Sequence, residues 1–138
     1  CIRDSTWTER TSEGALLWNS ITSSSDGTKL AAVEYDGYIY TSINSGSTWT
    51  QRSPVTASTP RKWESIASSS DGINLAAVAR GGYIYTSSDS GVNWTLQTGT
   101  SPRNWVGITS SSNGSKLAAI VMPGYIYTAV IGKTRSNS

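Results

Sequence analysis

The stretch GYIYTSSDSGVNWT at residues 82–95 determines how this sequence folds. It consists of a short aromatic segment, a polar segment that contains glycine, and a second segment that begins at a tryptophan. Aromatic and β-branched residues favour strands, and Gly beside Asp or Asn favours tight turns, so the stretch predicts a β-hairpin. The same stretch occurs as GYIYTSINSGSTWT at 37–50, and its first half returns as GYIYT at 124–128.

Three landmarks upstream of the hairpin repeat in one register. A tryptophan occurs at Trp18, Trp63 and Trp105, with spacings of 45 and 42 residues. An SSSDG or SSSNG block and an LAAV or LAAI block recur with the same two spacings. The pattern therefore predicts an internal repeat of four strands. In the second unit these strands are expected at 63–69, 75–79, 83–87 and 93–97, with turns at 70–72, 80–82 and 89–91.

A four-stranded unit of about 40 to 45 residues is typical of a β-propeller blade. The sequence therefore predicts an all-β chain with three blades, and no apolar run is long enough to span a membrane. Blade 1 is expected at 18–52, blade 2 at 63–97, the first three strands of blade 3 at 105–131, and a tail at 132–138.

Residues 1–10 are expected to form the strand that blade 3 lacks. STWTER at 5–10 matches STWTQR at 47–52, which is the last strand of blade 1. Known propellers have about four or more blades, so three cannot close a ring. We therefore expect 1–10 to complete blade 3 of a second copy, which gives a six-bladed homodimer by strand exchange. A fragment of a longer array and a nine-bladed ring of three chains are the alternatives.

Composition excludes several classes of function. The formal net charge is +2 with 14% charged residues, which argues against nucleic-acid binding. There is no His and one Cys, so we expect no metal, no cofactor and no Ser–His or Cys–His catalytic pair. Cys1 is compatible with a lipid anchor, a thiol that pairs between chains, or a plain terminal thiol. Asn93 and Asn113 begin N-x-[ST] triplets, which slightly favour an extracellular or cell-surface location but leave the compartment open.

A spaced Ser-x-Asx-x-Gly-x-x-Trp motif occurs in two of the hairpins. Its residues are Ser87, Asp89, Gly91 and Trp94 in blade 2, and Ser42, Asn44, Gly46 and Trp49 in blade 1. With the repeats around it, the chain resembles the BNR/Asp-box β-propellers, which include sialidases and photosystem II assembly factors of the Ycf48 type. The resemblance implies that the box is structural and lies on the face opposite the usual ligand site. Blade 3 departs from the pattern, because Ala129, Val130 and Ile131 follow Thr128.

The loops expected on the other face differ most between the repeats, which makes them the candidate ligand site. They span 9–17, 34–37, 51–62, 79–82, 96–104 and 121–124. Tyr35, Arg61, Arg80 and Arg103 in these loops are the candidate ligand-binding residues, for an anionic or polyhydroxyl ligand. Solvated loop charges paired with Glu34 or Asp36 are the alternative.

The sequence therefore favours a non-enzymatic binding or scaffold module, lectin-like or protein-binding, with no catalytic residue assigned. A sialidase-like glycosidase, and an amplified or engineered propeller fragment without a specialised ligand, are the alternatives.

Overall fold

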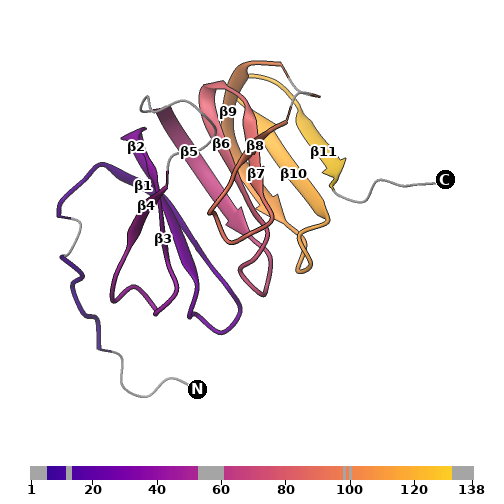
Figure 1. The fold of residues 1–138 in the computed structure, drawn as a ribbon. Helices are drawn as coiled ribbons and strands as arrows, with labels where there is room; N and C mark the ends of the chain where they lie inside the picture. The colour runs from indigo at the N-terminus through magenta and orange to yellow at the C-terminus, as the bar shows by residue number, and fades with distance from the viewer. Residues whose placement is uncertain (1–5, 12–13, 53–60, 98, 100, 132–138) are drawn as a thin grey trace.

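The computed structural model of the chain describes residues 6–11, 14–52, 61–97, 99 and 101–131 (Figure 1). Cys1, the tail at 132–138 and part of the candidate loops lie outside these residues. The described residues contain strands and no helix, which confirms the predicted all-β class.

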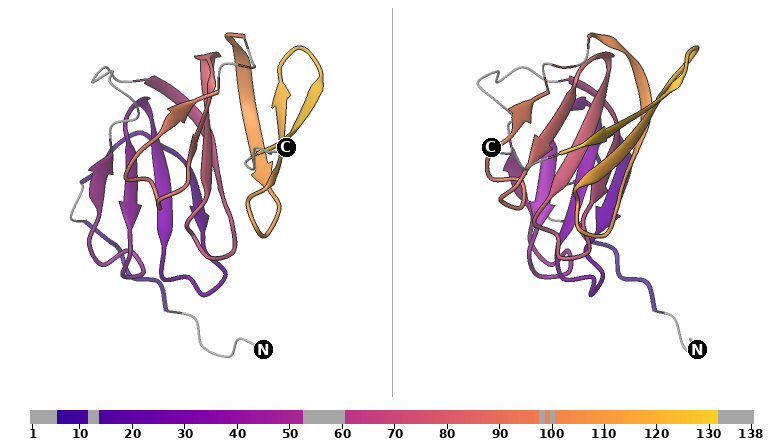
Figure 2. Two further views of the ribbon diagram at one scale, coloured as in Figure 1. Left: turned by 45° about the vertical axis from the view of Figure 1, so that its right-hand side comes forward. Right: turned by 90° about the vertical axis from the view of Figure 1, so that its right-hand side faces the viewer.

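The strands form three antiparallel units in chain order. Blade 1 contains β1 (Trp18–Ser23), β2 (Leu30–Gly37), β3 (Ile39–Ser42) and β4 (Thr50–Arg52). Blade 2 contains β5 (Arg61–Ser68), β6 (Leu75–Gly82), β7 (Ile84–Ser87) and β8 (Thr95–Leu96). In blade 3 the described strands are β9 (Arg103–Ser110), β10 (Lys116–Val121) and β11 (Ile126–Val130). Figure 2 shows the blades side by side, with blades 1 and 3 at opposite ends of the stack.

The second strand of blade 2 is longer than the sequence predicts. The predicted turn at 80–82 is the end of β6, where Arg80 pairs with Asn104 and Gly82 with Arg103 of β9. Blade 1 pairs with β5 in the same way, through Tyr35 and Gly37 of β2. The prediction was wrong here because pairing with the next blade, which a local pattern does not reveal, extends the strand. These bridges join the three blades into one continuous sheet.

The N-terminal segment forms no strand within the described residues 6–11. Its Trp7 is 94% exposed. Residues 6–8 and Arg10 line one side of an open groove of about 690 Å³, and the face of blade 1 that contains Trp18 and Trp49 lines the other. The interpretation of 1–10 as a strand of another copy stays a prediction.

The hydrophobic core lies between the blades rather than within one of them. One face of blade 2 packs against Ala31, Val33 and Ile39 of blade 1, and its buried side chains there are Trp63, Ile66, Leu75, Ala77, Ala79, Tyr85 and Trp94. The other face, with Val78 and Ile84, packs against Trp105 and Ala119 of blade 3. The second strands consist of small and β-branched residues. These side chains allow neighbouring blades to approach closely, so both faces of the strands are covered. A blade therefore depends on its neighbours for its core.

Candidate functional site

The blade stack has two ends of different character. The box end contains the Ser-rich turns at 24–28, 69–73 and 111–115 and the Ser-x-Asx-x-Gly turns at 43–48 and 88–93. Ser45 N donates to Thr28 O at 2.9 Å and Ser90 N to Ile73 O at 2.9 Å, so both kinds of turn lie together. The loop end contains the hairpins at 34–38, 79–83 and 121–125 and the segments that lead into the first strands. There Tyr35 N donates to Leu17 O at 2.7 Å.

The boxes are closed networks of local hydrogen bonds. In blade 2, Ser87 Oγ donates to Asp89 Oδ1 at 2.8 Å and accepts from Gly91 N at 2.9 Å. Asn93 N donates to Asp89 Oδ1 at 2.8 Å, and Trp94 Nε1 donates to the Gly91 carbonyl at 2.9 Å. Ser42, Asn44, Gly46 and Trp49 repeat this arrangement in blade 1. Because Gly91 has a φ of 88°, the turn favours glycine there.

The turn carboxylates at this end serve as hydrogen-bond acceptors. The Asn93 amide lowers the pKa of Asp89, and the Ser69 hydroxyl lowers the pKa of Asp71. The backbone amide of Thr28 lowers the pKa of Asp26 to about 2. Asp89 thus accepts hydrogen bonds within its own turn, and the structural role of the box stays a prediction.

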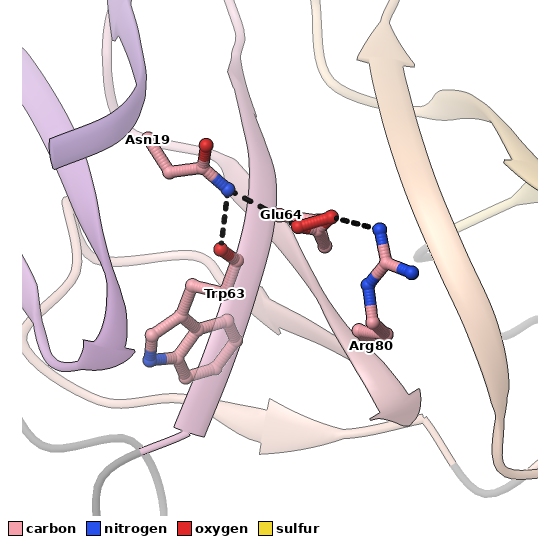
Figure 3. Close-up of polar contacts among 4 residues, drawn as sticks. All are labelled: Asn19, Trp63, Glu64 and Arg80. Carbon is pink, nitrogen blue, oxygen red and sulfur yellow. Dashed lines mark hydrogen bonds and ion pairs between the residues drawn. The ribbon is translucent and has the colours of Figure 1, made fainter. Parts of the chain in front are cut away.

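The loop end has a polar network that crosses from blade 1 to blade 2 (Figure 3). Asn19 Nδ2 donates to the Trp63 carbonyl at 2.9 Å and to Glu64 Oε2 at 3.2 Å. Arg80 Nη2 donates to Glu64 Oε1 at 2.9 Å. Asn19 and Glu64 stand at equivalent positions, each where the pairing of the first two strands shifts register. Such a bulge redirects a side chain out of the regular alternation of the strand.

Arg80 is held in place but remains accessible. Its side chain is 43% exposed, whereas that of Glu64 is 11% exposed. The hydrogen bond and charge of Glu64 raise the pKa of Arg80, and Tyr35 also acts on it electrostatically. The equivalent residues of the other blades are Tyr35 and Met122, so a cation stands at this position in blade 2 alone.

Arg61 and Arg103 occupy a different environment. The guanidinium carbons of Arg61 and Arg103 lie 5.2 Å from the ring centroids of Tyr85 and Tyr127, respectively. These rings in turn make T-shaped contacts with Trp63 and Trp105. Leu16 stands at this position in blade 1. The structure therefore places these two arginines at successive blade junctions, stacked on aromatic rings.

The four candidate residues are not one cluster. Tyr35 pairs with Lys62, beside Arg61, and lies within electrostatic range of Arg80 at the junction of blades 1 and 2. Arg103 is at the next junction, where it pairs with Gly82. Sequence reasoning missed Asn19 and Glu64. The sequence did contain a signal for them, because one repeat position varies: it is Asn19 in blade 1, Glu64 in blade 2 and Val106 in blade 3.

Among the described residues, no group of three or more His, Cys, Asp or Glu side chains is placed to hold a metal ion. None of the described segments forms a helix of the length and apolarity needed to cross a membrane.

No family model and no curated protein matches the chain, so the resemblance to the Asp-box family stays a prediction. Solved structures do match. YCF48 bound to D1 peptide has a TM-score of 0.68 at 16% identity, covering 83% of this chain and 38% of that one. YCF48 from Cyanidioschyzon merolae has a TM-score of 0.64 at 17% identity, covering 82% and 34%. The Niastella koreensis GH74 enzyme has a TM-score of 0.56 at 25% identity, covering 73% and 14%.

These similarities define a class of fold. The chain has the fold of a β-propeller, in agreement with the prediction. It spans little more than a third of the length of the YCF48 structures. The matches include both YCF48 bound to a D1 peptide and GH74 enzymes, so the fold alone does not separate binding from catalysis.

Proposed function

We propose that the chain is a non-enzymatic binding module whose loop end takes a polypeptide segment with an exposed carboxylate, at Arg80 and Tyr35. The observation that carries this proposal is the oriented guanidinium of Arg80. Glu64 accepts one hydrogen bond, from Nη2 of this guanidinium. The guanidinium has five N–H donors, and those that remain exposed can bind a carboxylate through two parallel hydrogen bonds. Because Asn19 and Glu64 fix this orientation in advance, little side-chain entropy is lost when the ligand binds.

The distribution of charge supports the same site. Arg61, Lys62 and Arg103 lie on the same end as Arg80 and add to its attraction for an anion. The negative charge of Glu64 partly offsets this attraction, so the geometry of the hydrogen bonds, more than net charge, must select the ligand. The similar YCF48 structure is bound to a D1 peptide, which supports a peptide as the class of ligand.

A glycosidase function has less support at the loop end. Most glycosidases place two carboxyl groups on either side of the scissile bond, one as acid and one as base or nucleophile. Here Glu64 is paired with Arg80 and Asn19, and Glu34 accepts a long 3.4 Å hydrogen bond from the Tyr38 amide. These two glutamates are thus engaged with their own chain, and Asp36 of the 34–38 hairpin is a third, exposed carboxylate at this end. An acidic glycan, bound but not cleaved, is the second ligand that the chemistry of Arg80 suits.

We further propose that the module works as a closed ring of six blades made by two copies. The first strands β1, β5 and β9 contact one another in succession, as the inner strands of a propeller do. Three such blades leave an arc with two uncovered faces, and a second arc of the same kind covers both. The loop ends of both copies then lie on one face of the ring, which presents two Arg80 sites.

Ligand arrays test the proposed site. The wild type is applied to an array of acidic peptides and to a glycan array, and hits are titrated by calorimetry. Arg80→Ala is expected to weaken binding roughly tenfold or more, since a hydrogen bond to a charged group contributes about 1.5 to 3 kcal/mol. Arg80→Lys should lose nearly as much, because lysine keeps the charge without the planar fork.

Lys62→Ala is the control for long-range attraction. It removes the same charge from the same end and is expected to weaken binding less than about threefold at physiological salt. Equal losses for Lys62→Ala and Arg80→Ala would contradict a directed contact at Arg80. Turnover of a glycoside by the wild type would contradict the non-enzymatic function.

A further inference from the structure

The chain makes the same blade-to-blade interface twice. The Ser25 amide donates to the Ser70 carbonyl at 2.7 Å, and the Ser70 amide donates to the Ser112 carbonyl at 2.7 Å. Gly72 lies against Lys29, and Gly114 lies against Asn74 at the equivalent place one blade further on. Contacts that repeat in this way belong to the blade as a unit, so an additional blade would form them again.

Blade 1 presents the receiving half of this interface without a neighbour. Its Trp18 is 42% exposed, whereas Trp63 and Trp105 are fully buried by the preceding blade. A Cβ at Gly27 would meet nothing within 4 Å, although the equivalent Gly72 and Gly114 are in tight contact. The face is therefore shaped to receive a blade.

Blade 3 presents the opposite half. Ile126 is 72% exposed, whereas the equivalent Ile39 and Ile84 are buried against the following blade. Ile120 is likewise exposed where Val33 and Val78 are buried. Exposed apolar faces of this kind mark interaction surfaces, and the chain already shows what covers their equivalents.

We propose that these two faces pack on each other between two copies of the chain, head to tail and twice per ring. This inference rests on the ring proposed above and names the contacts that close it. The Ser112 amide of one copy donates to the Ser25 carbonyl of the second, and Lys116 covers Gly27. Ile126 packs under Trp18, as Ile39 lies in one core cluster with Trp63. A two-fold axis makes both junctions identical.

The N-terminal segment then acts as a clasp with a defined register. In the complete blades Thr50 pairs with Thr41 and Thr95 pairs with Thr86. The matching position in STWTER is Thr8, which therefore pairs with Thr128 of the other copy. Arg52 Nε donates to Thr41 Oγ1 at 2.9 Å, and Gln97 Nε2 donates to Thr86 Oγ1 at 2.6 Å.

By the same equivalence Arg10 donates to Thr128 of the other copy. The groove between residues 6–10 and blade 1 is the place that the partner's blade 3 fills.

One feature makes the junction between copies weaker than those within the chain. Ser20 Oγ and Ser65 Oγ accept from the amides of Ile66 and Ile108 in the following blade, at 3.4 Å and 3.3 Å. Gly107 stands at the equivalent position in blade 3 and has no such acceptor. We therefore expect the copies to separate before the blades unfold.

Two substitutions on strand β11 test the interface. Ile126→Lys places a charge where the interface would be buried, and it is expected to raise the dimer dissociation constant at least 100-fold, since burying an unpaired charge is costly. Val130→Lys is the matched control. Val130 is 78% exposed, and its equivalents Ile43 and Ser88 stay exposed beside the following blade, so a change under about threefold is expected. Sedimentation equilibrium with reductant excludes disulfide dimers through Cys1.

The outcomes are separable from those of the ligand test. A dimer that Ile126→Lys dissociates and Val130→Lys preserves supports the interface, provided that circular dichroism shows both variants folded. A dimer that survives Ile126→Lys, or that both variants dissociate equally, overturns the interface. A wild-type monomer or a larger assembly overturns the two-copy ring. Peptide binding at Arg80 is measured on the same samples, so failure of the binding site and failure of the interface are told apart.

Discussion

Arg80 Nη2 lies 2.9 Å from Glu64 Oε1, and Glu64 is itself held by Asn19 of the preceding blade. The ion pair joins β5 to β6, and the contact with Asn19 joins both to blade 1. The three side chains therefore fix the position of one exposed guanidinium relative to two blades (Figure 3).

Glu64→Gln tests whether this pair orients Arg80 for binding. The amide keeps the size of the side chain but removes the charge that partly offsets the attraction for an anion. Because orientation matters more than net charge in this site, we expect peptide affinity still to fall, by roughly threefold to tenfold, as Arg80 gains freedom. The melting temperature should change little, because a partly exposed ion pair contributes little to stability. A lower melting temperature with unchanged affinity would show that the pair only stabilises the fold.

The Arg–Tyr stacks predict a graded loss of stability. Arg61→Ala removes a half-buried guanidinium from the Tyr85 ring and is expected to cost about 1–2 kcal/mol in urea unfolding. Arg103→Ala should cost about 0.5–1 kcal/mol, because Arg103 is exposed. The opposite order, or a ligand-affinity loss for Arg61→Ala as large as for Arg80→Ala, would contradict the packing role of Arg61.

The two box tryptophans are expected to differ. Trp94→Ala should lower the free energy of unfolding by about 3–5 kcal/mol, since Trp94 is buried in the core between blades 1 and 2. In the separated chain, Trp49→Ala should cost less than half as much, because Trp49 is only half-buried on the open face of blade 1. In the two-copy ring that face is covered, so the cost should rise toward that of Trp94→Ala as protein concentration increases. Urea unfolding at a low and a high protein concentration compares them, and a cost for Trp49→Ala that stays low at high concentration would contradict coverage by the second copy.

The turn carboxylates predict a loss of stability in acid. Their lowered pKa values mean that folding favours the ionised form. The stabilisation is complete above the ordinary Asp value of 3.8 and is lost as pH falls toward about 2, the pKa of Asp26.

The variant with Asp26→Asn, Asp71→Asn and Asp89→Asn should therefore show a flatter melting-temperature profile between pH 4 and pH 2. Asn113 and Asn44 already occupy equivalent turns, so asparagine fits there. An unchanged acid profile in the variant would mean that other groups govern acid unfolding.

The repeat register made the fold predictable, because each blade is encoded by local turn chemistry and alternating strands. The spacing of four residues is enough to predict a hairpin: Ser87, Asp89, Gly91 and Trp94. In the structure, side-chain oxygens and a backbone carbonyl accept the hydrogen bonds of that turn. The extension of β6 to Gly82 was not predictable, since it comes from pairing with the next blade.

The candidate site was harder to predict for the same reason. Loop variability directed attention to Tyr35 and Arg80, whose role in binding stays a prediction, but Glu64 lies inside a strand, where a local pattern assigns it to solvent. Only the bulge at Glu64 and the proximity of Asn19 reveal its contact with Arg80. The stacking of Arg61 on Tyr85 likewise depends on which strands become neighbours.

The mass of the wild-type chain in solution decides whether two copies close one ring. We expect a species of twice the 14.7 kDa chain mass by light scattering with reductant, at micromolar concentration. A stable monomer of 14.7 kDa under the same conditions would contradict the closed two-copy ring.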